Sequence, residues 1–258
     1  LATLQYRRER WNPDEIVYVV DARQKLHFEQ LFEAAKLWGF ENVALKHISF
    51  GTIFGEDGRP LSSRSGKSIE LRDLLGEAEQ RALAIVCEKN PDLSEDQQRE
   101  IARVIGIGAI KYTDLCQNRT SDYVFSWDKM LAMNGNTAPY LQYAYVRIRS
   151  IFRRAEEETQ VAAAKPEMHL EHPAEMELAK FLLRFNLAIE TALSDYRINA
   201  ISDYLFELAQ TFTAFYDACP VLKSEEPLRG SRLALCRLTA DVLRQGLHLL
   251  GIETIEQM

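Results

Sequence analysis

A run of β-branched and aromatic residues from Ile16 to Val20 constrains the fold of this chain most. Such a continuous run is typical of a strand that is buried on both faces, as in a parallel sheet. Apolar residues at helical spacing follow from His27 to Trp38, and Gly39 supplies a stop signal. Val43 to Phe50 then repeats the strand pattern. The order strand, helix, strand predicts a βαβ unit.

The pattern changes once along the chain. Residues 51–70 are rich in helix breakers, and from Ile69 onward the apolar spacing is almost wholly helical. We expect an irregular, aromatic segment at 121–132 and helices at 71–89, 92–115, 137–158, 174–193, 198–219 and 231–250. An α/β part thus occupies about 1–75 and an all-helical part the rest. Two strands are too few for an independent parallel sheet, so we expect a piece of a longer protein.

Composition excludes some classes of function. The net charge of −7 means that a nucleic-acid role would require the basic residues to gather on one face. No apolar run approaches the ~20 residues of a membrane helix, so no membrane role is expected. The four cysteines form no C-x-x-C pair, which predicts a cytoplasmic protein without a structural zinc. His169 and His172 lie in a polar segment that we interpret as a linker, and we predict that they do not bind a metal.

The expected helix at 137–158 has two distinct sectors. Thr137 or Asn136 can cap it, and Pro139 suits its first turn. At 100° per residue the core sector holds Leu141, Ala144, Tyr145, Ile148, Ile151 and Phe152, and the neighbouring sector holds Tyr140, Tyr143, Arg147, Ser150 and Arg154. Aromatic rings stack on unpaired bases and arginines meet phosphates. From periodicity alone, this sector is either an RNA-binding face or a solvated basic edge.

Residues 61–68, Leu-Ser-Ser-Arg-Ser-Gly-Lys-Ser, form a second candidate site. Backbone amides, hydroxyls and cations together suit a phosphate. The glycine and lysine spacing is not that of a Walker A loop. A flexible surface loop is the alternative.

Several stretches, in this order, carry a resemblance to a known family. They are Tyr18–Phe28 (YVVDARQKLHF), Phe50–Gly58 (FGTIFGEDG), Ser63–Gly66 (SRSG), Ile110–Tyr112 (IKY), Phe125–Leu131 (FSWDKML), Asn136–Ser150, Leu249–Ile252 (LLGI) and the terminal Met258. Over nearly its whole length the chain resembles the C-terminal half of arginyl-tRNA synthetase. The resemblance implies a fold of class α/β plus all-α. A partial Rossmann-like class I catalytic domain at 1–115 would precede a helical-bundle anticodon-binding domain at 116–258.

The resemblance also implies a substrate site in the α/β part. Gln24 would help to hold the substrate L-arginine, and His27 would lie near the nucleotide; the alternative for Gln24 is to cap the helix that follows. Residues 60–66 correspond to the signature loop that closes over the triphosphate of ATP, which Mg²⁺ accompanies. Pro60 and Ser63 stand where the signature has lysines. The predicted catalytic residues of this loop are therefore Ser62, Ser63, Arg64 and Lys67.

In the helical part the resemblance implies contacts with the anticodon of the arginine tRNA (tRNA-Arg). The residues carried over are Asn136, Tyr140, Tyr143, Arg147, Tyr216 and Met258. The family's histidine-glycine signature is absent from these residues, so we expect that this chain forms no arginyl-adenylate by itself. We separately expect a monomer. The alternative is a non-catalytic tRNA-binding helical module derived from a class I synthetase. Gln24 and the hydroxyl-rich loop favour the ligase, because a pure anticodon binder needs neither.

Overall fold

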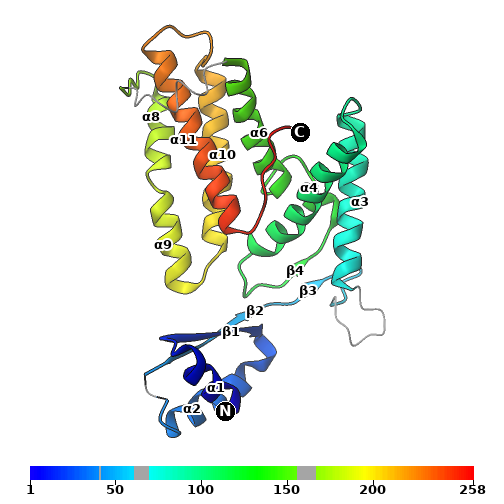
Figure 1. Cartoon of the computed structure of the whole chain (residues 1–258), viewed down its shortest axis with the longest axis vertical. Helices are drawn as coiled ribbons and strands as arrows, with labels where there is room; N and C mark the ends of the chain where they lie inside the picture. The colour runs from blue at the N-terminus through cyan, green and yellow to red at the C-terminus, as the bar shows by residue number, and fades with distance from the viewer. Residues whose placement is uncertain (41, 61–69, 156–166) are drawn as a thin grey trace. The chain divides into compact units, whose positions relative to one another are not determined.

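The structure is a computed structural model that describes residues 1–40, 42–60, 70–155 and 167–258 (Figure 1). The chain divides into two compact units. The first consists of Leu1–Ser62 with Asn118–Phe125, and the second of Ser63–Gln117 with Ser126–Met258.

The first unit contains the predicted βαβ arrangement. Helix α1 (Ala2–Trp11) precedes strand β1 (Glu15–Asp21), the short 3-10 turn η1 (Ala22–Gln24), helix α2 (Lys25–Leu37) and strand β2 (Ala44–Phe50). The two strands are parallel, with Glu15 opposite Ala44 and Asp21 opposite Phe50. The sequence therefore predicted both strands and the helix between them correctly.

Strand β1 is buried on one face only, so the expectation of burial on both faces is wrong for the described residues. Ile16 packs with Leu4, Ala35 and Phe40, which come from α1, α2 and the turn after α2. Val19 points to the opposite face and is 65% exposed. In the described first unit, helices cover only the face that carries Ile16, because successive side chains of a strand alternate between faces.

A second pair of short parallel strands joins two distant segments of the first unit. Strand β3 (Ile53–Phe54) pairs with β4 (Tyr123–Val124). The Gly51 backbone N–H donates to the Arg119 carbonyl at 2.7 Å, and a Cβ at Gly51 would meet the Ser121 carbonyl oxygen at 2.5 Å. Only glycine at position 51 therefore allows these two segments of the chain to approach so closely.

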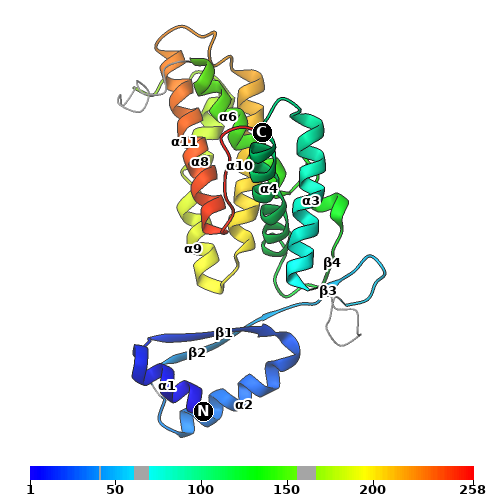
Figure 2. The same ribbon diagram turned by 45° about the vertical axis from the view of Figure 1, so that its right-hand side comes forward.

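The second unit is helical (Figure 2). Its helices are α3 (Leu71–Lys89), α4 (Glu95–Leu115), α5 (Trp127–Met130), α6 (Ala138–Ala155), α8 (Pro173–Leu182), α9 (Phe185–Asp195), α10 (Asn199–Ala218) and α11 (Leu228–Leu249). A capping box of Ser94 and Gln97 begins α4, as the sequence indicated near 92–94. None of the described helices combines the length and the apolar character needed to cross a bilayer.

Two predictions about this unit need correction. The single helix expected at 174–193 is two helices, because the chain turns at Leu183 and Arg184. Leu183 is 83% exposed at this turn. No glycine or proline marks the turn, so the apolar spacing predicted one continuous helix. The segment expected to be irregular at 121–132 contains β4 and α5.

Helices α3 and α4 pack closely where Gly106 faces Ala78. A Cβ at Gly106 would lie 2.8 Å from the Ala78 carbonyl oxygen and 2.9 Å from the Glu79 backbone nitrogen. Backbone atoms cannot move aside as a flexible side chain can. The absence of a side chain at Gly106 therefore sets the distance between the two helices.

We predict that Gly106→Ala lowers the free energy of unfolding by about 1–3 kcal/mol, because the added methyl group forces the helices apart. The matched control is Gly76→Ala in α3, where an added Cβ meets nothing within 4 Å. That change should stabilise the protein by about 0.5–1 kcal/mol through the lower entropy of the unfolded chain. Urea denaturation followed by circular dichroism measures both. Equal effects of the two substitutions would show that the helices do not depend on this contact.

Candidate functional site

Helix α6 presents one exposed ring beside its buried face. All six residues of the predicted core sector are buried, and Tyr145 is 3% exposed. Tyr143, in the neighbouring sector, is 46% exposed. The prediction of the core sector is therefore confirmed. Gln142 and Val146 are buried as well, which the apolar pattern did not indicate.

Arg147 joins α6 to the end of α10. Its guanidinium carbon lies 4.4 Å from the centre of the Tyr216 ring, and its Nη2 lies 3.5 Å from Asp217 Oδ1. A cation held over an aromatic face is attracted by the negative charge of the ring face. The structure thus brings together two of the predicted RNA-binding residues from helices about 70 residues apart in the sequence. The Tyr216 ring and the Asp217 carboxylate therefore hold the Arg147 side chain in one orientation, whereas an arginine surrounded only by water would have none.

The N-terminal end of α6 is fixed by neutral hydrogen bonds. The Thr137 hydroxyl caps the helix by accepting from the Tyr140 backbone N–H at 3.3 Å, as one of the two predicted capping residues. The Tyr140 ring meets the Phe206 ring edge-on, with 5.7 Å between centroids. Asn136 Oδ1 lies 2.6 Å from the Tyr112 hydroxyl, which also lies 3.1 Å from the buried Ser202 carbonyl.

The protonation state of Tyr112 supports its role as a donor. Burial raises the pKa of Tyr112 well above its ordinary value, and the nearby Cys116 and Asp203 raise it further. The hydroxyl therefore keeps its proton at neutral pH and can donate to Asn136. Asn136 itself is exposed and lies in the turn before α6. A buried tyrosine on α4 thus positions an exposed candidate side chain.

Met258 is not joined to Tyr216 by any hydrogen bond or ring contact among the described residues. It is partly buried at the end of the segment that follows α11. Its neighbour Glu256 contacts Tyr145 and Arg149, which lie on a different side of α6 from Tyr143 and Arg147. The role of Met258 stays a prediction.

The predicted substrate residues follow strand β1. Gln24 ends η1, is exposed, and stands at the N-cap position directly before α2, where its side chain makes no capping hydrogen bond. Instead, Asp21 accepts from the Arg23 backbone N–H at 2.8 Å and caps η1. The alternative reading of Gln24 as a helix cap therefore finds no support. His27 is exposed, with its ring edge-on to Phe28.

Sequence reasoning missed a second histidine near this edge. His47 of β2 lies with Nε2 3.0 Å from the Val20 carbonyl oxygen and stacks on the Phe28 ring at 4.7 Å. It sits in an alternating strand pattern, which gave no sign that it would reach across to β1. Ser62, Ser63, Arg64 and Lys67 lie outside the described residues.

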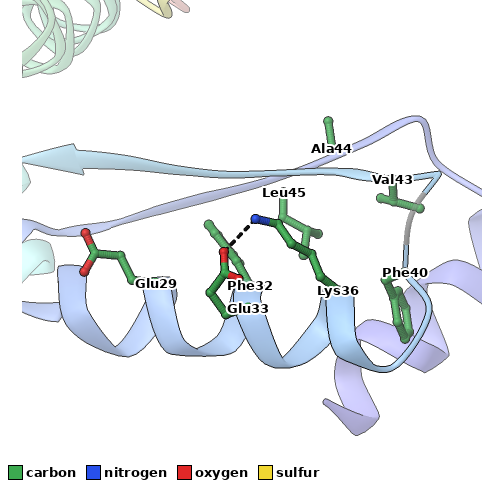
Figure 3. A pocket seen from close by; sticks show the side chains of 8 residues that line it. All are labelled: Glu29, Phe32, Glu33, Lys36, Phe40, Val43, Ala44 and Leu45. Carbon is green, nitrogen blue, oxygen red and sulfur yellow. Dashed lines mark hydrogen bonds and ion pairs between the residues drawn. The ribbon is translucent and has the colours of Figure 1, made fainter.

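A cavity of about 620 Å³ lies between α2 and β2 (Figure 3). Its lining includes apolar Phe32, Phe40 and Leu45 together with Lys36 and Glu33, which form an ion pair of 2.6 Å with each other. Neither Gln24 nor His27 lines it. Among the described residues, no group of three or more histidine, cysteine or acidic side chains is placed to hold a metal ion. The cavity is therefore separate from the predicted substrate residues.

Comparison with known families accounts for both parts of the chain. Residues 1–127 match the model of the class I tRNA synthetases (R), catalytic domain, and residues 141–258 match the DALR anticodon binding domain. The whole chain is 49% identical to the arginine–tRNA ligase of Laribacter hongkongensis and 48% identical to that of Chromobacterium violaceum. The chain belongs to the arginyl-tRNA synthetase family. The predicted fold class, a partial class I catalytic domain followed by a helical anticodon-binding domain, is thereby confirmed.

Solved structures of arginyl-tRNA synthetases agree with this assignment. The Thermus thermophilus enzyme matches over 95% of this chain with a TM-score of 0.84 and 34% identity, and the chain covers 41% of it. The Plasmodium falciparum enzyme matches over the whole chain with a TM-score of 0.82 and 31% identity, and the chain covers 44% of it. The chain spans 45% of the length of each of the two curated relatives named above.

We predict that Tyr112→Phe lowers the free energy of unfolding by about 0.5–1.5 kcal/mol, because Asn136 Oδ1, which lies 2.6 Å from the hydroxyl, loses its donor. The matched control is Tyr143→Phe, which removes the same atom from an exposed ring and should change stability by less than about 0.5 kcal/mol. Urea denaturation monitored at two wavelengths measures the difference. If both variants unfold at the parent's urea concentration, the Tyr112 hydroxyl does not hold the turn at Asn136.

Proposed function

We propose that this chain is part of an arginine–tRNA ligase, which activates L-arginine with ATP and transfers it to tRNA-Arg. The family membership supports this activity, as does the similarity to the two arginine–tRNA ligases named above. We assign residues 1–115 to the catalytic domain and 116–258 to the anticodon-binding domain. We also place the protein in the cytoplasm as a monomer.

The observation that carries the RNA-binding part of the proposal is the surface made by Tyr143, Arg147 and Tyr216. Tyr143 offers an exposed ring, and Arg147 lies over Tyr216 at 4.4 Å. These groups lie within the region that matches an anticodon-binding domain. Unpaired bases stack on aromatic rings and on guanidinium planes, while arginine also pairs with phosphate. An anticodon loop, with unpaired bases and a charged backbone, fits this chemistry.

In this proposal, the α/β part binds the substrate L-arginine. Gln24 follows the carboxyl end of β1, the side on which parallel sheets usually bind their ligands. Its amide oxygen can accept from the guanidinium of the substrate L-arginine. ATP and Mg²⁺ would supply the activated phosphate, and Ser62, Ser63, Arg64 and Lys67 are the side chains that we propose to stabilise its charge.

We predict that Tyr143→Ala weakens the binding of tRNA-Arg roughly 5- to 150-fold. This range corresponds to the ~1–3 kcal/mol that a stacked base gains from one aromatic ring. Because Tyr143 lies outside the buried sector, the helix content and melting temperature should stay close to those of the parent. Filter-binding titrations with parallel circular dichroism melts measure these quantities.

Tyr145→Ala is the control from the opposite side of the helix. Tyr145 is 3% exposed and donates to Glu256 at 3.0 Å, so its loss should lower stability. Its tRNA affinity, corrected for the folded fraction, should equal that of the parent. If Tyr143→Ala binds tRNA like the parent while Tyr145→Ala binds more weakly at equal folded fraction, the assigned face of α6 is wrong.

A further inference from the structure

Helices α6 and α10 contact each other side by side in the second unit (Figure 1). Near the start of α6, the Tyr140 ring meets the Phe206 ring, with 5.7 Å between centroids. Further along α6, the Arg147 guanidinium lies over the Tyr216 ring and 3.5 Å from Asp217 Oδ1. Earlier residues of α6 thus meet earlier residues of α10, so the two helices run in the same direction.

Tyr143 and Gln210 lie between these two contacts, one on each helix. At a rise of about 1.5 Å per residue, Tyr143 lies about 4.5 Å along α6 from Tyr140, and Gln210 lies about 6 Å along α10 from Phe206. At about 100° per residue, Gln210 falls within about 40° of both Phe206 and Asp217, which contact α6. Tyr143 and Gln210 therefore stand at nearly the same level of the surface that the two helices form.

The amide of Gln210 is accessible to a ligand. The side chain is exposed, and within the part of the chain that the structure describes no group forms a hydrogen bond with it. Its polar neighbours on α10 are engaged, because the Thr213 hydroxyl donates to the Ala209 carbonyl at 2.9 Å and Asp217 accepts from Arg147. Gln210 thus retains both amide donors and the carbonyl acceptor for a ligand.

Stacking on a ring such as Tyr143 does not distinguish one base from another, because every base offers a π face. Proteins read the sequence of single-stranded RNA through hydrogen bonds to the edges of splayed bases. A glutamine amide carries a donor and an acceptor side by side, and this arrangement matches neighbouring acceptor and donor groups on a base edge. A base that stacks on Tyr143 and extends across to α10 would bring its edge to the level of Gln210.

We propose that Gln210 determines base specificity on this surface by hydrogen bonding to the edge of the unpaired anticodon-loop base that stacks on Tyr143. This inference rests on the proposed binding of tRNA-Arg. It adds a residue that neither the helical pattern of α6 nor the family resemblance indicated. A wrong base leaves its own polar edge or the Gln210 amide without a partner, and unmet hydrogen bonds lower affinity.

Gln210→Met tests the proposal, because methionine keeps the length and the helix propensity of the side chain but has no amide. The probes are a tRNA-Arg transcript and a set of transcripts in which one anticodon-loop base at a time is replaced. Filter binding should show that Gln210→Met reduces the preference for the original base roughly 5- to 150-fold at one loop position, the range of a two-point contact between an amide and a base. Preferences at the other positions should not change. Circular dichroism melts should match those of the parent.

The matched control is Gln245→Met on α11, which removes an exposed amide elsewhere and should leave every preference unchanged. Tyr143→Ala should lose the preference at the same loop position as Gln210→Met, because the base is no longer held beside the amide. If Gln210→Met behaves like Gln245→Met, or weakens all transcripts equally, while Tyr143→Ala still weakens tRNA-Arg binding, the specificity role is wrong and the proposed function stands. If the parent binds no transcript and Tyr143→Ala changes nothing, the RNA-binding function fails, and the role of Gln210 fails with it.

Discussion

The burial of α6 on most of its circumference is the constraint on which the helical unit depends. Leu141 and Ile148 are fully buried, and Gln142 is as inaccessible as they are. Each buried aliphatic side chain of this size contributes about 1.5–3 kcal/mol by leaving water. A helix held in this way cannot rotate without exposing part of its core. The narrow strip that stays accessible, with Tyr143 at its centre, is therefore fixed in direction by packing.

This rigidity has a chemical consequence for the residues beside the strip. Because α6 and α10 are both fixed by their cores, Arg147 meets Tyr216 and Asp217 in a defined arrangement. An arginine that is already stacked loses less conformational freedom when a ligand binds. The stacked ring and the charge are thus already arranged for the RNA that we propose to bind here.

Periodicity predicted the parts of this arrangement that depend on neighbours in the sequence. The core sector of α6 and both strands of the βαβ unit follow from local spacing, and the structure bears them out. Gln142 was missed because the segment that buries it follows more than 100 residues later. The turn at Leu183 was missed because no glycine or proline marks it and Phe185 continues the apolar spacing of α8. Contacts between distant segments leave little trace in local patterns.

The contacts of the candidate site also join segments that lie far apart in the sequence. The sequence placed Tyr143 and Arg147 on one side of a helix, but it could not show that Tyr216 lies under Arg147. The roles of Gln24, His27 and Met258 came from the family resemblance alone, and the structure gives their positions without testing those roles. Physical reasoning from the residues thus predicted that Tyr143 and Arg147 lie side by side, whereas tertiary structure was needed to show that Arg147 contacts Tyr216.

The charge of α6 differs in sign from the net charge of the whole chain. The whole chain carries a net charge of −7, yet α6 contains four arginines and no acidic residue. Charges farther apart than the ~8 Å screening length at physiological salt influence an approaching phosphate little. The acids nearest to these arginines are Asp217 and Glu256, each of which pairs with one arginine of α6. Asp217 lies beside the accessible strip and Glu256 on the other side of the helix, so the pairing of individual arginines, more than the net charge of the chain, would govern where the proposed RNA ligand meets α6.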